Sequence, residues 1–295
     1  MENIADKGIL TLAVGQKFNR QAKYLAYSCI VHSPTLPRAI ITDNCKYFKE
    51  LYDVIIQYTA DMGDPFNVKL KLHNYSPFFE TLFLDSDTLA YTDLRFMWGY
   101  LGDQSIVYAG DCRKEGEWFS IEIGEVLKYY DIPWIGKFNS GIFLFRKDET
   151  GIKVLNYAAE LHEDHGDIKI PFFRRKMLPD EPFLAIAFGK YGQLPKRDFG
   201  RLGRSLLGTK DVKLDIIKGI TKFIKNGELV FPAIVHFTGD KRNYYSEEKI
   251  RLFLYYKGIS GGVGIYNAPV YVVSKFLMCI NFIKRCVKYI LKRIS

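Results

Sequence analysis

Thr81-Leu82-Phe83-Leu84-Asp85-Ser86-Asp87-Thr88 joins a short apolar run to two carboxylates that stand one residue apart. A run of this kind, apolar on both sides and only a few residues long, is typical of a buried β-strand. Ionised carboxylates at the end of a buried strand are very costly to bury unless a cation lies between them. The stretch therefore predicts a strand of a central sheet with a charged site at its end.

Similar apolar runs recur on both sides of this strand. A helix-like stretch at about residues 21–30 separates the first two, so the chain begins with a β-α-β pattern, and another helix is expected over residues 181–190. Alternating strands and helices predict an α/β fold with a mostly parallel sheet flanked by helices, and ligands bind beyond the carboxyl ends of such strands. The other expected strands are residues 9–15, 39–43, 53–57, 138–145 and 230–237.

Length and composition exclude several classes of protein. The chain has 295 residues, of which 48% are apolar, so it is long enough for one large domain with an appendage, and disorder is not expected. Its five cysteines form no CxxC pair, which argues against a zinc knuckle or a disulfide framework and favours a reducing compartment. No run approaches the roughly 20 apolar residues that cross a bilayer. We therefore expect a cytoplasmic protein that is soluble or peripheral on the inner face of the membrane.

The positive charge gathers at the carboxyl end. Residues 270–295 contain six basic residues and no acidic one, so +6 of the net charge of +9 lies there and +3 remains for residues 1–269. Apolar residues recur at helical spacing on one side, which predicts a basic amphipathic helix lying on an anionic membrane. A terminal helix docked on the main domain is the alternative. Nucleic acid is not expected as a partner, because no aromatic platform accompanies the charge. The predicted division is residues 1–264 and 265–295.

Asp85 and Asp87 admit two interpretations. Carboxylate oxygens suit a hard divalent ion such as Mn²⁺ or Mg²⁺, and an ion that also bridged a substrate diphosphate would need few protein ligands. Alternatively, both aspartates cap a turn or the next helix, as aspartate often does. The DxD pattern alone does not separate these interpretations.

Four further motifs add context, and their order along the chain is informative. They are KLHNY at residues 71–75, FNSG at 138–141, LPDE at 178–181 and IVHFTGDKR at 234–242. With the DxD pattern, this combination resembles the family 8 retaining glycosyltransferases, the group that contains glycogenin and bacterial lipooligosaccharide galactosyltransferases. The resemblance covers about residues 9–245 and implies the GT-A fold, a Rossmann-like α/β architecture.

The resemblance implies a metal site and a donor. Asp85, Asp87 and His236 match the family ligands of Mn²⁺, which holds the diphosphate of a UDP-sugar, and Ser86 lies between the two aspartates. Without the resemblance, His236 is expected to be a hydrogen-bonded core histidine. Gly239 matches a glycine that lets the backbone approach phosphate.

The basic residues after His236 depart from the family pattern. Arg242 occupies the position of the family lysine, and Lys241 stands beside it. Either cation could neutralise the departing UDP, so the assignment between them stays open.

The sugar end of the donor is implied to involve five residues. Lys71 matches a family lysine near the donor, and the alternative is a solvated helix lysine. Asn139 and Ser140 match the FN(A/S)G motif, whose asparagine contacts the donor sugar; a structural turn is the alternative. Asp180 matches an aspartate that binds sugar hydroxyls, and Glu181 stands where the family usually has glutamine. Asp180 and Glu181 could instead cap the helix that follows.

The residues that would hold the nucleoside of the donor are the least clearly marked in the sequence. The turn after the first strand contains Gly15 and Phe18, in the place where family members hold uridine. Phe18 is a candidate to stack on uracil, although a glycine after a strand is also a common turn device.

The function implied is transfer of a hexose from a UDP-sugar to a hydroxyl of a glycan or glycolipid acceptor, with a divalent metal and with retention at the anomeric carbon. Front-face transfer with Asp180 and Glu181 beside the donor sugar is the mechanistic hypothesis. Two other classes remain open. A nucleotidyltransferase acting on sugar phosphates could use the same layout, but the turn at Gly15 lacks a basic, Gly-rich phosphate loop. A non-catalytic peripheral membrane scaffold could retain the fold without binding a donor.

Overall fold

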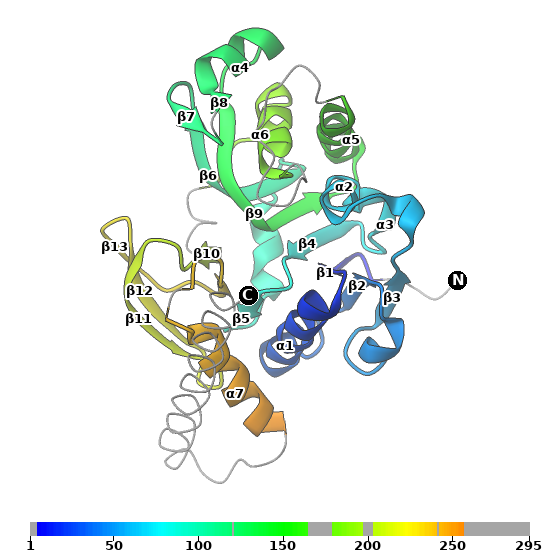
Figure 1. Ribbon diagram of the computed structural model, residues 1–295, viewed down its shortest axis with the longest axis vertical. Helices are drawn as coiled ribbons and strands as arrows, with labels where there is room; N and C mark the ends of the chain where they lie inside the picture. The colour runs from blue at the N-terminus through cyan, green and yellow to red at the C-terminus, as the bar shows by residue number, and fades with distance from the viewer. Residues whose placement is uncertain (1–4, 120, 165–178, 197–202, 241, 257–295) are drawn as a thin grey trace, which may run out of the picture.

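The protein has a mixed α/β architecture built on one large sheet (Figure 1). The computed structural model describes residues 5–119, 121–164, 179–196, 203–240 and 242–256. Within these, the central sheet has six strands in the order β3-β2-β1-β4-β9-β6. They are β1 (Lys7–Ala13), β2 (Arg38–Thr42), β3 (Val54–Gln57), β4 (Glu80–Leu84), β6 (Ile106–Arg113) and β9 (Ile135–Arg146).

The direction of the strands confirms the predicted sheet. β1 pairs in parallel with β2 and β4, and β2 with β3, whereas β9 runs antiparallel to both of its neighbours, β4 and β6. Only one strand of the six is therefore reversed. Because the parallel strands end at the same edge, the residues that follow β1, β2 and β4 lie along that edge.

Helices cover both faces of the sheet, which explains why its strands are apolar on both sides. Leu10 and Phe83 belong to a core shared with α5 and α6, whereas Ile9 and Leu82 belong to a core shared with α1. Neighbouring residues of a strand point to opposite faces, so each strand contributes to both cores. The helices are α1 (Gln16–His32), α2 (Pro65–Leu70), α3 (Leu72–Tyr75), α4 (Ile123–Tyr130), α5 (Glu149–Glu163), α6 (Glu181–Lys190) and α7 (Tyr244–Tyr256), with short 3-10 helices at Cys45–Phe48, Ala60–Met62 and Arg95–Tyr100.

A small second sheet lies over the edge where β4 ends. It consists of β10 (Gly203–Ser205), β14 (Ile234–His236) and β5 (Thr88–Ala90). β14 runs antiparallel to β5, and His236 pairs with Thr88. This register brings a residue from late in the chain next to the acidic end of β4.

The predicted strand at residues 230–237 is wrong as one element. It is two strands, β13 (Glu228–Val230) and β14, which belong to different sheets. Pro232 lies between them, and proline cannot donate a ladder hydrogen bond. β13 completes a third sheet with β11 (Thr209–Asp215) and β12 (Ile220–Lys225), and β7 (Glu117–Trp118) pairs with β8 (Ile121–Glu122).

The predicted basic helix at residues 270–295 lies outside the described residues, as does the predicted boundary at residue 264. Within the part of the chain that the structure describes, no helix combines the length and apolarity needed to cross a membrane.

Candidate active site at the ends of the central strands

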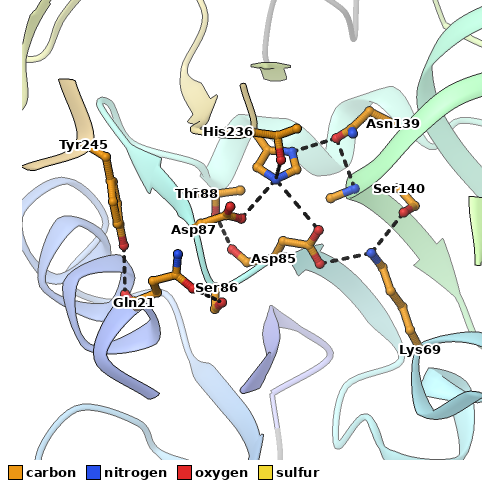
Figure 2. Close-up of polar contacts among 12 residues, drawn as sticks. Gln21, Lys69, Asp85, Ser86, Asp87, Thr88, Asn139, Ser140, His236 and Tyr245 are labelled. Carbon is orange, nitrogen blue, oxygen red and sulfur yellow. Dashed lines mark hydrogen bonds and ion pairs between the residues drawn. The ribbon is translucent and has the colours of Figure 1, made fainter. Parts of the chain in front are cut away.

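Two carboxylates and one imidazole meet where β4 ends (Figure 2). His236 Nε2 lies 2.9 Å from Asp87 Oδ1 and 3.9 Å from Asp85 Oδ2. One ligand atom from each of the three residues falls within 4.8 Å of the others. These side chains come from β14 and from the turn between β4 and β5, so pairing of the small sheet with β5 assembles the cluster.

The hydrogen bonds that close the turn carrying Asp85 do not involve its carboxylate. Thr88 donates to the Asp85 carbonyl from its backbone N–H at 3.0 Å and from its Oγ1 at 2.8 Å. The Asp85 carboxylate instead faces Lys69 and His236. Capping of the turn therefore does not account for the Asp85 side chain.

The residues present fit a divalent cation. Two carboxylates and an imidazole are a suitable donor set for Mn²⁺, and carboxylate oxygens also suit Mg²⁺. Space beside them is kept by Gly141 of β9, because a Cβ at this position would overlap His236 Cε1 and lie 2.8 Å from Asp85 Oδ2. Asp85, Asp87 and His236 are thus the residues that could hold a metal.

Burial and mutual charge shift the pKa values of the three groups. Burial raises the pKa of Asp85. The charges of Lys69 and His236 act to lower this pKa, but burial has the larger effect. Burial also acts to raise the pKa of Asp87, but its hydrogen bond to His236 lowers that pKa overall. Burial would lower the pKa of His236, yet the contacts with Asp87 and Asp85 raise it. The cluster is thus arranged to hold positive charge against two carboxylates.

Asn139 of β9 fixes the orientation of His236. Its Nδ2 donates to Glu181 Oε1 at 3.2 Å, and its Oδ1 lies 2.6 Å from His236 Nδ1. Gly141 N, which can only donate, also lies 3.3 Å from Asn139 Oδ1, so the amide oxygen faces the imidazole. His236 Nδ1 is therefore the donor, and Nε2 is directed toward Asp85 and Asp87.

Lys69 is buried at the centre of the cluster. Its Nζ lies 3.0 Å from Asp85 Oδ1, 3.0 Å from Ser140 Oγ and 3.2 Å from Asp180 Oδ2. Burial lowers the pKa of Lys69, but the charges of Asp180 and Asp85 outweigh it and raise the pKa above its ordinary range. Asp64 positions the lysine by capping α2, since it accepts from Phe66 N at 2.8 Å.

Asp180 and Glu181 open α6 and face the same cluster. Asp180 is 3% exposed and makes no side-chain cap, so helix capping does not explain it. Its Oδ2 contacts Lys69 without hydrogen-bond geometry and has no hydrogen-bond partner within the described residues. Glu181 Oε1 accepts from Ser140 N at 3.0 Å. Burial, with the neighbouring Asp180, raises the pKa of Glu181 to about 7.

Similar solved structures are glycosyltransferases. The chain is 14% identical to galactosyltransferase LgtC in complex with donor and acceptor sugar analogs, with a TM-score of 0.56 over 88% of this chain and 99% of that one. An active-site variant of LgtC with glutamine replaced by glutamate gives 15% identity and a TM-score of 0.54 over 83% and 95%. The bifunctional glycosyltransferase WbbM gives 12% and 0.52 over 86% of this chain and 52% of that one. The chain has the GT-A glycosyltransferase fold.

This GT-A fold confirms the architecture that the sequence predicted, and the resemblance to family 8 glycosyltransferases is supported at the level of fold. No protein-family model matches the chain, and no curated protein matches it by sequence.

Lys71 is not part of the cluster, contrary to the sequence-based assignment. Its Nζ pairs with Glu163 on α5, and the lysine that contacts Asp85 is Lys69. Lys69 belongs to α2, whereas Lys71 follows the end of that helix and separates it from α3. The two side chains therefore leave the chain in different directions.

Ser86 and Ser140 have different surroundings. Ser86 is 4% exposed, and its Oγ donates to Gln21 Oε1 at 3.3 Å, so it ties the DxD turn to α1. Ser140 lies in the cluster between Lys69 and Glu181.

The residues after His236 are only partly placed. Gly239 has φ +76°, and a Cβ there would lie 2.9 Å from Leu207 Cδ1, so both backbone and packing require glycine. Arg242 is exposed, and its backbone N–H donates to Asp240 Oδ1 at 3.1 Å. Lys241 lies outside the described residues. The structure therefore does not choose between Lys241 and Arg242.

The turn at Gly15 follows β1 and is hydrogen-bonded to the residue that follows β2. Gly15 has φ +93°, and its N–H donates to Asp43 Oδ2 at 2.9 Å, which joins the ends of β1 and β2. Phe18 is half-buried and packs against a small core that includes Ile40 and Phe48, so part of its ring is not free to stack. A cavity of about 430 Å³ lies beside this turn, lined by Gln16, Asn19, Arg20, Asp43, Asn44 and Tyr47.

Proposed function

We propose that this protein is a metal-dependent retaining glycosyltransferase that moves a hexose from a UDP-sugar to a hydroxyl of a glycan or glycolipid. One observation carries the proposal: Asp85, Asp87 and His236 converge at the ends of the central strands of a GT-A fold. The similarity to LgtC, which was solved with donor and acceptor sugar analogs, supports the same reading.

The three ligands would hold Mn²⁺ or Mg²⁺, which supplies Lewis-acid stabilisation of the charge that grows on the diphosphate as the sugar leaves. Gly239 would let the backbone approach that phosphate, and Lys241 or Arg242 would add positive charge. The nucleoside is assigned to the turn at Gly15, with Phe18 beside it.

The sugar is assigned to the pocket between Asp180, Glu181 and Asn139. Asp180 Oδ2 is a buried acceptor without a hydrogen-bond partner in the described chain, so it suits a sugar hydroxyl. Lys69 Nζ lies 3.2 Å from this oxygen and 3.0 Å from Asp85 Oδ1, so it holds the two carboxylates beside each other.

Retention is assigned to front-face transfer, in which the acceptor hydroxyl attacks from the side that UDP leaves. Glu181 Oε1 accepts from Ser140 N and Asn139 Nδ2. This oxygen atom is therefore already hydrogen-bonded to β9. Mass-spectrometric detection of a sugar covalently attached to Glu181 would overturn this part of the proposal.

The location proposed is the cytoplasm, peripheral on the inner face of the membrane, with the basic segment at residues 265–295 as the anchor. The six basic residues and the helical apolar spacing in this segment support the assignment.

The test is a thermal-shift panel of nucleotide sugars with and without Mn²⁺. We expect a UDP-sugar to stabilise the protein only when Mn²⁺ is present, because the metal would hold the diphosphate and the stabilisation grows with the affinity of the ligand.

Asp85→Ala should abolish both the metal-dependent shift and transfer. Asp93→Ala, which removes an exposed aspartate paired with Arg95, should change neither. Near-normal turnover in Asp85→Ala would refute the metal assignment. Release of diphosphate when UTP and a sugar 1-phosphate are supplied would indicate a nucleotidyltransferase, and absence of any nucleotide shift would indicate a scaffold.

A further inference from the structure

The outward face of the β11–β12–β13 sheet carries lysines and apolar side chains together. In the antiparallel register Lys210 is opposite Ile224, Lys222 is opposite Lys213, and Ile224 is opposite Leu229. Directly opposed residues point to the same side of a sheet, as do alternate residues of one strand. Lys210, Lys213, Ile220, Lys222, Ile224 and Leu229 therefore share one face, which we call the lysine face.

Burial shows that this face points to solvent. In β12, Thr221 and Phe223 are buried on the opposite side, whereas Ile220 is 44% exposed. Leu229 is 52% exposed, and Phe231, which follows β13, is 61% exposed. Figure 1 shows β12 and β13 at the outer edge of the molecule. Ile220 and Leu229 are thus exposed on the same face as three lysines, and Phe231 is exposed just after β13.

Basic residues outnumber acidic residues on the lysine face. Lys213 and Lys222 are direct cross-strand partners, and like charges in such a pair destabilise the sheet. Asp215 is opposite Ile220 and so shares this face, at its end and 3.9 Å from Lys218. Asp211 is exposed in the bulge beside Lys210, and Glu228 is opposite Lys225 on the other side of the sheet. No carboxylate of the described chain forms an ion pair with Lys210, Lys213 or Lys222. The face is arranged for an anionic partner that also accepts apolar side chains.

We propose that the lysine face docks on an anionic lipid bilayer. The lysines lie beside lipid phosphates, and Ile220, Leu229 and Phe231 enter the boundary between headgroups and acyl chains. A second copy of this chain fits less well, because a symmetric contact would oppose two basic faces. The proposal is independent of the transferase activity and of the segment after residue 256.

The experiment measures binding of the full chain to vesicles of phosphatidylcholine with and without phosphatidylglycerol. Lys210, Lys213 and Lys222 are changed together to glutamine, and the matched control changes the exposed Lys49, Lys114 and Lys128 to glutamine. Each lysine near an anionic surface contributes roughly fivefold to binding. We therefore expect the first variant to bind phosphatidylglycerol vesicles at least tenfold more weakly than the wild type, and the control to change by less than about twofold.

A second variant, Leu229→Trp, reports insertion directly. Its fluorescence should shift to the blue on phosphatidylglycerol vesicles and stay unchanged on phosphatidylcholine alone. If both triple variants lost vesicle binding equally, binding would depend only on the net charge of the protein, and the proposal would be overturned. Vesicle binding without a fluorescence shift in Leu229→Trp would also overturn it, because it would place the membrane contact elsewhere on the chain. The Mn²⁺-dependent shift with UDP should be equal in all variants, which separates this result from failure of the proposed function.

Discussion

At the scale of single residues, the orientation of His236 depends on Asn139, which accepts from Nδ1 and so directs Nε2 to the carboxylates. Asn139→Leu removes this acceptor at similar volume, and we expect affinity for Mn²⁺ to fall roughly 10–100-fold, the usual cost of losing such an outer hydrogen bond. Electron paramagnetic resonance of free Mn²⁺ in a titration measures it. Asn74→Leu, at an exposed position in α3, is the control. Unchanged affinity in Asn139→Leu would refute the orienting role.

The residues that the sequence predicts best are those at strand ends. Asp85 and Asp87 could be found because a buried run stops at two charges, and a charged group there needs a partner. Lys69 could not be found in the same way. Whether Lys69 or Lys71 enters the cluster depends on where α2 ends, which is a difference of two residues in a boundary that sequence patterns locate poorly. The carboxylate partners of Lys69, Asp85 and Asp180, come from elements far apart in the chain.

At the scale of elements, β9 brings the FNSG motif against the DxD turn, and Asp85 N donates to Gly141 O at 2.9 Å. Gly141→Ala would place a methyl group against His236 Cε1 and Asp85 Oδ2. We expect Mn²⁺ binding at least tenfold weaker and a loss of about 1–3 kcal/mol in the free energy of unfolding, the usual cost of overpacking. Calorimetric titration and urea denaturation measure the two effects. Gly99→Ala, where a Cβ meets nothing within 4 Å, should leave metal binding intact; a similar loss in both variants would contradict the steric argument.

The elements that the sequence failed to predict are short or carry polar residues on one face. The apolar runs of β1, β2, β4 and β9 predict strands, because both sides of the central sheet are buried there. β3, at the edge of the sheet, is also predicted, although its apolar residues are only half-buried. β11 and β12 were missed, because their outward residues are largely lysines and no continuous apolar run remains. The bulge between Lys210 and Lys213 further disturbs the alternation of β11.

At the scale of the whole molecule, the distribution of charge is only partly visible in the sequence. Counting residues locates +6 in the terminal segment, and this remains a prediction about residues outside the described chain. Counting does not reveal that Lys210, Lys213 and Lys222 share a face, since Asp211 and Asp215 stand among them in sequence. Strand register places the three lysines on one face with Asp215 at its end, and register is set by turns and packing rather than by composition.

Glu248 links α7 to the rest of the molecule and should make folding sensitive to pH. It is 1% exposed, and its Oε2 accepts from Ile216 N at 2.6 Å and from Tyr91 OH at 3.2 Å, while Oε1 accepts from Arg251 at 2.8 Å. Burial raises the pKa of Glu248 from 4.5 to about 7, although Arg251 opposes the shift. The carboxyl group therefore joins α7 to the residues that follow β5 and β11 while resisting ionisation.

The sign of the resulting pH dependence follows from proton binding. Between pH 4.5 and about 7 the folded chain keeps a proton on Glu248 that the unfolded chain has lost, so its contribution to the free energy of unfolding falls as pH rises. Glu248→Gln keeps an acceptor and removes the titration. The stability of this variant minus that of the wild type should therefore rise across the window by roughly 1–3 kcal/mol in urea denaturation. Glu247→Gln, which removes a neighbouring carboxylate outside these contacts, controls for loss of charge. A difference that stays flat or falls with pH would show that Glu248 is already ionised in the folded protein, held by Arg251.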